Sequence, residues 1–141
     1  MKLPEIWEAS VDDSCPPPEE VDVADAIDNL VFLAVESDGE VVGVFVSTLP
    51  DSSGSIEAHT MMTKKCRGRM AIEAGKKAIE WFFSNLGCKR IQSWCFSDAP
   101  NVIFFAKHCG FSFLRNRDRP VSRKGKQVEI LEFYLDKPVN P

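Results

Sequence analysis

The strongest constraint on the fold of this chain is a long amphipathic segment with a strand-like segment on either side. Residues 69–86 carry apolar side chains at helical spacing, and Gly87 follows as a typical helix stop. These apolar residues are Ile72, Ala78, Ile79, Trp81, Phe82, Phe83 and Leu86. Residues 55–63 before the segment and 89–96 after it are typical of strands. The sequence therefore predicts an α/β (α+β) fold in which helices flank a central sheet.

The segments outside this unit add a hairpin and several shorter elements. Residues 31–36 and 40–49 are rich in β-branched and aromatic side chains and enclose the turn signal Ser37-Asp38-Gly39, which predicts a hairpin. The remaining predicted elements are strands over 4–9, 111–117 and 128–135, and helices over 18–30 and 100–109. We therefore expect a mixed central sheet of six to seven strands.

The length of 141 residues fits a single domain, but charge divides the chain unevenly. Nine carboxylates against Lys2 give residues 1–31 a charge of −8, and since the whole chain carries −4, the remaining residues carry +4. We interpret residues 1–141 as one domain with a shortened acidic segment over 1–31 and a core over 32–135. A basic stretch over 115–126 is typical of a solvated hairpin. Nucleic-acid binding is not expected, because stacking aromatics are not interleaved with this stretch.

Several classes of protein are disfavoured by missing sequence features. No apolar run approaches the ~18 residues of a membrane span, and residues 1–30 lack the basic start and apolar stretch of a signal peptide, so we expect a cytoplasmic protein without membrane contact. The five cysteines show neither C-x-x-C nor Cys/His ligand spacing, which indicates reduced structural thiols and no metal site. Motifs of serine hydrolases, phosphate-loop kinases and paired-histidine metalloenzymes are absent from the sequence.

The predicted strand over 55–63 carries two side chains suited to acid–base chemistry. Glu57 and His59 are two residues apart and therefore share one face of the strand, together with Met61. Histidine exchanges protons near neutral pH, so the pair can serve as the base that removes a proton from an amine. The alternative is a structural role, with His59 partly buried and Glu57 in solvent.

The start of the long helix has the composition of an anion site. In Arg67-Gly68-Arg69, the glycine lets a ligand approach free backbone N–H groups, the helix dipole favours an anion, and two arginines add positive charge. The tripeptide is equally compatible with an ordinary charged helix start. The sequence thus predicts a pyrophosphate site here, with the ordinary helix start as the alternative.

The order of elements and three motifs resemble the GCN5-related N-acetyltransferase (GNAT) superfamily over residues 32–134. Glu40-Val41-Val42-Gly43-Val44 resembles the "dgevvG" strand pair of that family, Cys66-Arg67-Gly68-Arg69 resembles the loop of its acetyl-CoA site, and Gly110-Phe111 resembles the end of its short helix. A histidine-bearing strand before an Arg-Gly-basic turn, followed by the helix over 71–83, is most similar to the short GNAT-like proteins of bacteriophages.

The resemblance implies an acetyl-CoA-dependent N-acetyltransferase in which an amine attacks the thioester directly, without a metal. It implies a catalytic base on the strand before the phosphate loop, for which Glu57 and His59 are the candidates. It also implies cofactor contacts from the end of that strand and the start of the helix: Met61, Met62, Arg67, Gly68, Arg69, Met70, Ala71 and Ile72. The implied setting is the cytoplasm of a bacterial or phage-infected cell, and a homodimer is compatible with the resemblance.

The chain departs from the family pattern at four positions. Met70 and Ile72 stand where the phosphate loop usually has small residues. Alignment on Gly110-Phe111 puts Ala99 at the usual asparagine and Ala106 at the tyrosine that commonly protonates the departing thiolate. These departures support a second hypothesis, a non-catalytic GNAT-like binding or virion-associated module.

The acidic segment over 1–31 bears on the acceptor of the transferred group. Exposed carboxylates attract cations over roughly a Debye length, ~8 Å at physiological salt. We therefore expect a basic acceptor, either a protein amine or a polyamine. The alternative is that this segment pairs with the basic stretch over 115–126 and neutralises it.

Overall fold

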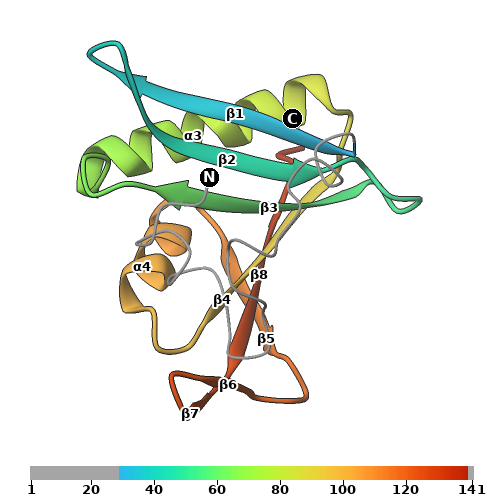
Figure 1. Ribbon diagram of the computed structural model, residues 1–141. Helices are drawn as coiled ribbons and strands as arrows, with labels where there is room; N and C mark the ends of the chain where they lie inside the picture. Colours follow the sequence, from blue (N-terminus) through green and yellow to red (C-terminus); the bar gives the residue numbers. More distant parts are fainter. Residues whose placement is uncertain (1–28, 140–141) are drawn as a thin grey trace.

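The main sheet of the protein has six strands in the order β1-β2-β3-β4-β8-β5 (Figure 1). In the computed structural model, which describes residues 29–139, these strands are β1 Leu30–Ser37, β2 Glu40–Thr48, β3 Ser55–Met62, β4 Arg90–Phe96, β8 Ile130–Asp136 and β5 Ser112–Asn116. The other elements are the ribbon of β6 Val121–Arg123 and β7 Lys126–Val128, and the helices α3 Gly68–Asn85 and α4 Pro100–His108. The predicted mixed sheet of six to seven strands is confirmed with six.

Two elements predicted for the start of the chain fall outside this description. The strand over 4–9 lies entirely outside residues 29–139, and so does the helix over 18–30 except for its last two residues. Of these two, Leu30 starts β1 and is not helical.

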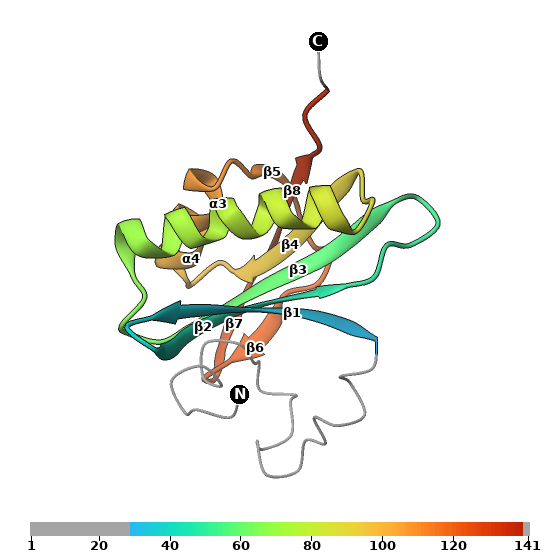
Figure 2. The ribbon, with the colours of Figure 1, turned by 90° about the horizontal axis from the view of Figure 1, so that it is seen from above.

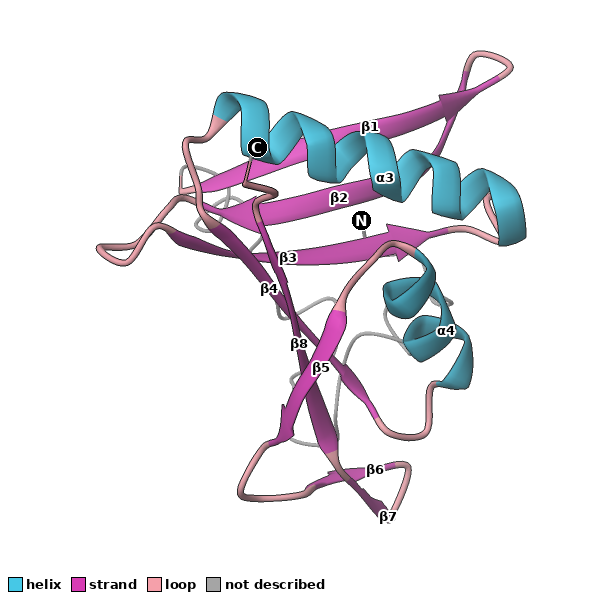
Figure 3. Ribbon diagram, turned by 180° about the vertical axis from the view of Figure 1, so that it is seen from behind, coloured by secondary structure: helices cyan, strands magenta, loops and turns pink. Residues whose placement is uncertain are grey.

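The strands β3 and β4 form the only parallel pair among the described strands, and they stay paired for just three residues. Ser55 to Glu57 align with Arg90 to Gln92, whereas β2 continues to pair with β3 as far as Met62. Figure 3 shows β4 leading away from β3 toward β8 and β5, to which it is joined by antiparallel pairing. The strand of His59 and the strand of Arg90 therefore separate after three paired residues.

Helix α3 covers one face of the sheet (Figure 2). Its buried side packs in the same core as residues of β2, β3 and β4. The buried residues of the helix are Ala71, Gly75, Ala78, Phe82 and Phe83, and those of the strands are Val42 and Phe45 of β2, Ile56 and Met62 of β3, and Ile91 of β4. The helix agrees with the predicted range of 69–86 to within one residue at each end. Trp81 differs from the expected apolar stripe, because it lies 38% exposed with its ring edge-on to Phe82.

Helix α4 has a defined start and a defined end. Pro100 opens it, at a position where the missing N–H has no helical partner to lose. At its end the N–H of Phe111 donates to the carbonyl of Ala106 and the N–H of Gly110 to that of Lys107, which is a Schellman motif. This motif explains why the Gly110-Phe111 pair marks the boundary between α4 and β5.

The predicted hairpin in the basic stretch is present as β6 and β7, but one of its arginines is not solvated. Arg123 is 8% exposed, donates to the carboxylate of Asp98 and lies 4.4 Å from the centre of the Phe96 ring. Phe96 forms a second small core with Val128 and Ile130. The hairpin thus packs on the end of β4 through Arg123, which differs from the expectation of a fully solvated hairpin.

The two helices approach each other closely at Gly75. A Cβ atom built on Gly75 would lie 2.7 Å from Sγ of Cys109 and 2.9 Å from Cζ of Phe105. Real Cβ contacts are longer than this, so any side chain at position 75 would displace the side chains of Cys109 and Phe105. The position of α4 therefore depends on the glycine.

We expect the substitution Gly75→Ala to destabilise the protein by about 1 to 2 kcal/mol. Alanine adds roughly 1 kcal/mol of helix propensity, but displacing Cys109 and Phe105 costs about 2 to 3 kcal/mol. Urea unfolding measures the net change, and adding Cys109→Ala, which removes the nearest atom, should recover part of the loss. Equal or higher stability of Gly75→Ala would contradict the close helix contact.

Candidate active site

A groove of about 640 Å³ lies where the end of β3, the start of α3 and the start of α4 meet. Figure 3 shows these three elements together at one side of the molecule. The groove is lined by Thr60, Met61 and Met62 of β3, by Arg67 and residues of the first turn of α3, and by Val102, Phe104 and Phe105 of α4. The structure thereby brings the predicted anion site and the predicted strand end into one concave surface.

The α3 end of the groove is open to an anion. Gly68 has a φ of +60°, a backbone conformation that residues other than glycine rarely adopt. A Cβ atom built on Gly68 would meet no described atom within 4 Å. Arg67 at the N-cap makes no side-chain capping bond, and no acidic residue stands in the first turn of this helix. The N-cap side chain therefore accepts no hydrogen bond from the first backbone N–H groups of α3, and a bound anion can accept these hydrogen bonds.

The two arginines of the predicted phosphate loop point in different directions. Arg67 lines the groove, whereas the side chain of Arg69 is 93% exposed, lies 3.4 Å from Glu73 one turn along the helix, and is outside the groove lining. Of the two, Arg67 is therefore the one placed to meet an anion in the groove.

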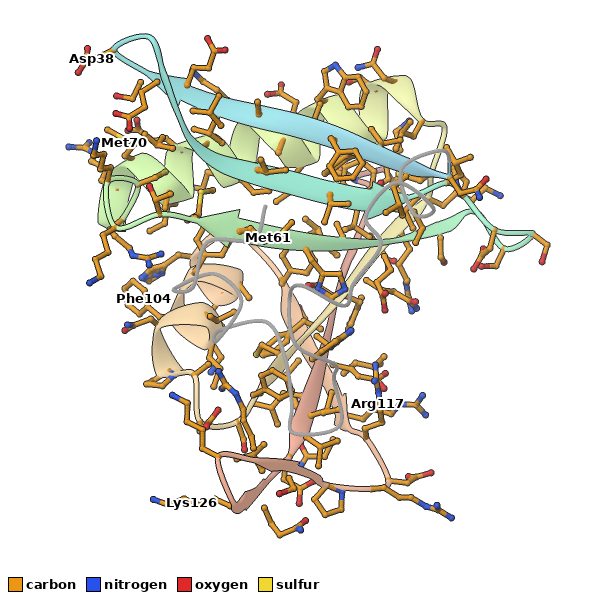
Figure 4. The ribbon with its side chains drawn as sticks, in the orientation of Figure 1. Asp38, Met61, Met70, Phe104, Arg117 and Lys126 are labelled. Carbon is orange, nitrogen blue, oxygen red and sulfur yellow. The ribbon has the colours of Figure 1, made fainter. Side chains whose placement is uncertain are left out.

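The bulky residues of this loop also differ in position. Met70 is 44% exposed and is not part of the groove lining; in Figure 4 it lies on the opposite side of the β3 end from Phe104 of α4. Ala71 and Ile72 do line the groove, with Ala71 buried and Ile72 half-buried. The departure from small residues therefore narrows the groove at Ile72 and leaves it unaffected at Met70.

One edge of β3 is free beside the groove. From Ala58 to Met62 this strand pairs with β2 on one side, and within residues 29–139 no strand pairs with its other side. Free backbone N–H and C=O groups on such an edge can bind an extended ligand as a further strand does.

A second cavity of about 320 Å³ occupies the gap between β3 and β4. It shares Thr60, Met61, Ala99, Val102 and Phe105 with the groove, so the two adjoin each other. Its wall includes His59 and Trp94 as well as Ile79 and Phe82 of α3. The cavity therefore reaches from the face of the sheet that carries His59 to the face that α3 covers.

The predicted acid–base pair is in contact at this cavity. Nε2 of His59 lies 3.3 Å from Oε2 of Glu57, and the two side chains are 32% and 46% exposed. The face assignment is confirmed, because Ile56, Ala58 and Met62 pack in the core under α3. The ring of Trp94 lies edge-on to the imidazole with 5.3 Å between ring centres. The imidazole is thus held between a carboxylate and an indole.

Trp94 is the site residue that the sequence did not reveal. It lines the cavity beside His59, and the guanidinium of Arg117 lies 5.4 Å from its ring centre. Local sequence patterning cannot place Trp94 beside His59, since the residue of β3 that Trp94 meets depends on where β4 separates from β3. Its aromatic character on a predicted strand is the only available signal.

A paired carboxylate lies next to Arg117. Nε of Arg117 donates to Glu132 at 2.9 Å, and Nε of Arg115 donates to the other carboxylate oxygen at 3.3 Å. Hydrogen bonding by Arg117, aided by Arg115, lowers the pKa of Glu132. Glu132 is therefore charged and committed to these arginines near neutral pH.

The thiols at the cavity are poor nucleophiles. Cys95 and Cys109 line it, and burial raises the pKa of each to about 11, so both are protonated near neutral pH. Cys66 and Cys88 are buried as well, and burial raises the pKa of both. The prediction of free structural thiols is confirmed for these four cysteines, and Cys15 lies outside the described residues.

The alanines at the two departures near α4 are on the cavity wall. Ala99 lines both the groove and the cavity, and Ala106 lines the cavity, where it offers no hydroxyl group. The ring of His108 lies edge-on to that of Phe104 with 3.8 Å between ring centres, and Tyr134 lies under the guanidinium of Arg90; His108 and Tyr134 are both outside the two linings. The described residues thus present no tyrosine to this site.

Residues 29–139 contain no group of three or more His, Cys, Asp or Glu side chains placed to hold a metal ion. Neither helix of this part of the chain is long and apolar enough to cross a membrane.

Comparison with known proteins gives one family and a set of solved structures. The sequence model of the acetyltransferase (GNAT) family matches residues 3–111. Spermidine N-acetyltransferase from Vibrio cholerae, solved in complex with CoA and spermine, superposes with a TM-score of 0.77 at 13% identity, over 94% of this chain and 82% of that one. A Bacillus subtilis acetyltransferase in complex with CoA superposes with a TM-score of 0.67 at 16% identity, over 82% of each chain. These structural likenesses show a shared fold. No curated protein sequence matches the chain.

Proposed function

Because this chain belongs to the acetyltransferase (GNAT) family, we propose that it is an acetyl-CoA-dependent N-acetyltransferase in which an amine attacks the thioester directly. The observation that carries the proposal is that the groove with the candidate anion site adjoins a cavity beside the Glu57–His59 pair. A donor bound in the groove would then have its reactive end next to a proton acceptor. The CoA-bound structures with the same fold support this reading.

The groove has the chemistry that CoA needs. The uncapped N–H groups after Gly68 and the guanidinium of Arg67 suit a pyrophosphate, and the free edge of β3 at Met61 and Met62 suits the amide groups of the pantetheine arm. The one carboxylate in the groove lining, Asp98, is paired with Arg123, so its repulsion of phosphate is offset. The residues present therefore fit CoA.

His59 is the residue we assign as the base, with Glu57 as its partner. Bound acetyl-CoA supplies a thioester carbonyl carbon, at which a C–N bond to the amine forms as the C–S bond breaks. The ring nitrogen of His59 that does not face Glu57 accepts the proton that the amine loses, directly or through water, and Glu57, whose Oε2 lies 3.3 Å from Nε2, stabilises the imidazolium that results. Trp94 limits the rotation of the imidazole through its edge contact.

A second candidate function follows from Ala106. This position on the cavity wall cannot protonate a leaving thiolate, because it has no hydroxyl group. A protein that binds CoA without turning it over would tolerate this alanine. A non-catalytic GNAT-like binding module is therefore the alternative proposal, and the kinetic experiments below separate it from the enzyme.

For the acceptor we propose a basic amine, such as a polyamine or a protein amine. The −8 charge of residues 1–31 favours cations near the chain. In the basic stretch, Arg115 and Arg117 are both paired with Glu132, and Arg123 is paired with Asp98. These ion pairs reduce the positive charge that the acidic segment would otherwise have to neutralise. The structural neighbour from Vibrio cholerae is a spermidine N-acetyltransferase solved with spermine, which agrees with this class of acceptor.

We expect Arg67→Glu to weaken the binding of CoA by about 10- to 100-fold, since it replaces a charged donor to phosphate with a carboxylate. Isothermal titration calorimetry measures the affinity. Lys77→Glu makes the same charge reversal on an exposed residue of α3, about 14 Å further along the helix, and should change affinity by less than about twofold at physiological salt. Arg69→Glu should have an intermediate or small effect. Equal affinities for Arg67→Glu and Lys77→Glu would remove the assignment of the anion site.

We expect His59→Ala to lower kcat by about 100-fold and Glu57→Gln to lower it less, with CoA affinity retained in both. His108→Ala removes the other histidine and should leave kcat unchanged. If both site variants keep full turnover, the pair is structural; CoA binding without any turnover supports the non-catalytic module.

We expect cationic amines to be acetylated faster than anionic ones, and their rates to fall several-fold as salt is raised. The reason is that screening weakens the attraction between exposed carboxylates and a cation. A panel of polyamines, a lysine peptide and an acidic amino acid, assayed with acetyl-CoA at low and high ionic strength, tests this. Best activity with anionic acceptors, or rates with cations that are indifferent to salt, would contradict the proposal.

A further inference from the structure

We infer that the cavity between β3 and β4 binds the acyl chain of the donor, and that this protein binds CoA thioesters of straight four- to six-carbon acids more tightly than acetyl-CoA. The inference rests on the proposed function, since it assumes that CoA lies in the groove. The inference concerns the size of the transferred acyl group, whereas the proposed function assumes an acetyl group of two carbons.

The first argument is the size of the cavity. Its volume is about 320 Å³, apart from the 640 Å³ of the adjoining groove. A water molecule takes about 30 Å³ in the liquid, and an acetyl group occupies the space of only two or three such units. Most of the cavity would thus stay empty behind an acetyl group, whereas four further methylene groups could be accommodated.

The second argument is the chemistry of the inner wall. Toward α3 the cavity is bounded by Phe45, Ile79, Phe82, Ile91 and Phe133, of which Phe82, Ile91 and Phe133 are among the most deeply buried residues described. The thiols of Cys95 and Cys109 add two neutral, weakly polar groups. An apolar space of this kind holds water poorly, so transfer of a hydrocarbon chain into it is favourable.

The third argument is the path into the cavity. The groove and the cavity share Ala99 and Thr60, and Ala106 forms a further part of the wall. Small side chains at 99 and 106 leave the passage from the groove into the gap wide. Of the polar residues of the wall, Thr60 and Ser93 lie on the strand faces that α3 covers, whereas His59 lies on the opposite face, from which the amine must reach it. A chain directed toward α3 and an amine arriving from the His59 face would therefore not compete for room.

The test is a chain-length series on the unsubstituted protein. Calorimetry with CoA, acetyl-CoA, butyryl-CoA and hexanoyl-CoA gives four dissociation constants without relying on turnover. Each buried methylene group contributes about three- to fourfold to affinity, so butyryl-CoA, with two more of them, should bind at least roughly tenfold more tightly than acetyl-CoA, and hexanoyl-CoA more tightly still. Affinity that is flat or falls with chain length overturns the inference and leaves the proposed function intact. This result is expected if the pantetheine arm, and not the acyl chain, fills the cavity. Failure of all four to bind removes the proposed function itself.

A matched pair of variants locates the chain. Ala106→Leu fills the cavity from α4 and should reduce the ratio of the acetyl-CoA and butyryl-CoA dissociation constants from roughly ten to about one. Ala34→Leu makes the same change at an exposed residue of β1, outside both linings, and should keep the ratio at roughly ten. Thermal unfolding checks that both variants fold. If Ala106→Leu does not fold, Ile79→Phe, which adds bulk to the cavity from α3, takes its place. A ratio unchanged by these cavity-filling variants overturns the location.

Discussion

The candidate site depends on the short pairing of β3 with β4, which ends at Glu57 and Gln92. Beyond that point β3 keeps β2 as its neighbour, β4 keeps β8, and the two halves of the sheet part. The parting leaves a free strand edge and a cavity that crosses the sheet. Helix α4 closes one end of the gap, and its approach to α3 at Gly75 brings Phe105 to the junction of groove and cavity. Continuous pairing of β3 with β4 would leave no space for a thioester.

Charge is distributed so that the groove keeps one positively charged end. Most arginines near the site have a carboxylate partner: Arg115 and Arg117 hold Glu132, Arg123 holds Asp98, and Arg69 faces Glu73 in solvent. Arg67 lines the groove beside the uncapped start of α3. Because the helix dipole and this guanidinium act at the same point, an anion is favoured there over the rest of the described groove.

Helix α4 gives the site an unusual wall. Its first residues border the groove and its second half borders the gap, but the side chains at 99 and 106 are methyl groups. The same feature that removes a proton donor for the thiolate enlarges the cavity. In the enzyme that we propose, turnover without that donor and room for a larger acyl group would both follow from these two small residues.

The sequence by itself determined the features that depend on residues a few positions apart. The spacing of apolar residues set the range of α3, the Ser37-Asp38-Gly39 turn set the hairpin of β1 and β2, and strand alternation put Glu57 and His59 on one face. Only the tertiary structure decided which residues from distant segments meet. Trp94 lies beside His59 because β4 leaves β3 where it does, Arg67 and not Arg69 lines the groove, and Arg123 is buried on Phe96. The physical reason is that strand register and helix docking are set by long-range packing, of which a local pattern carries no trace.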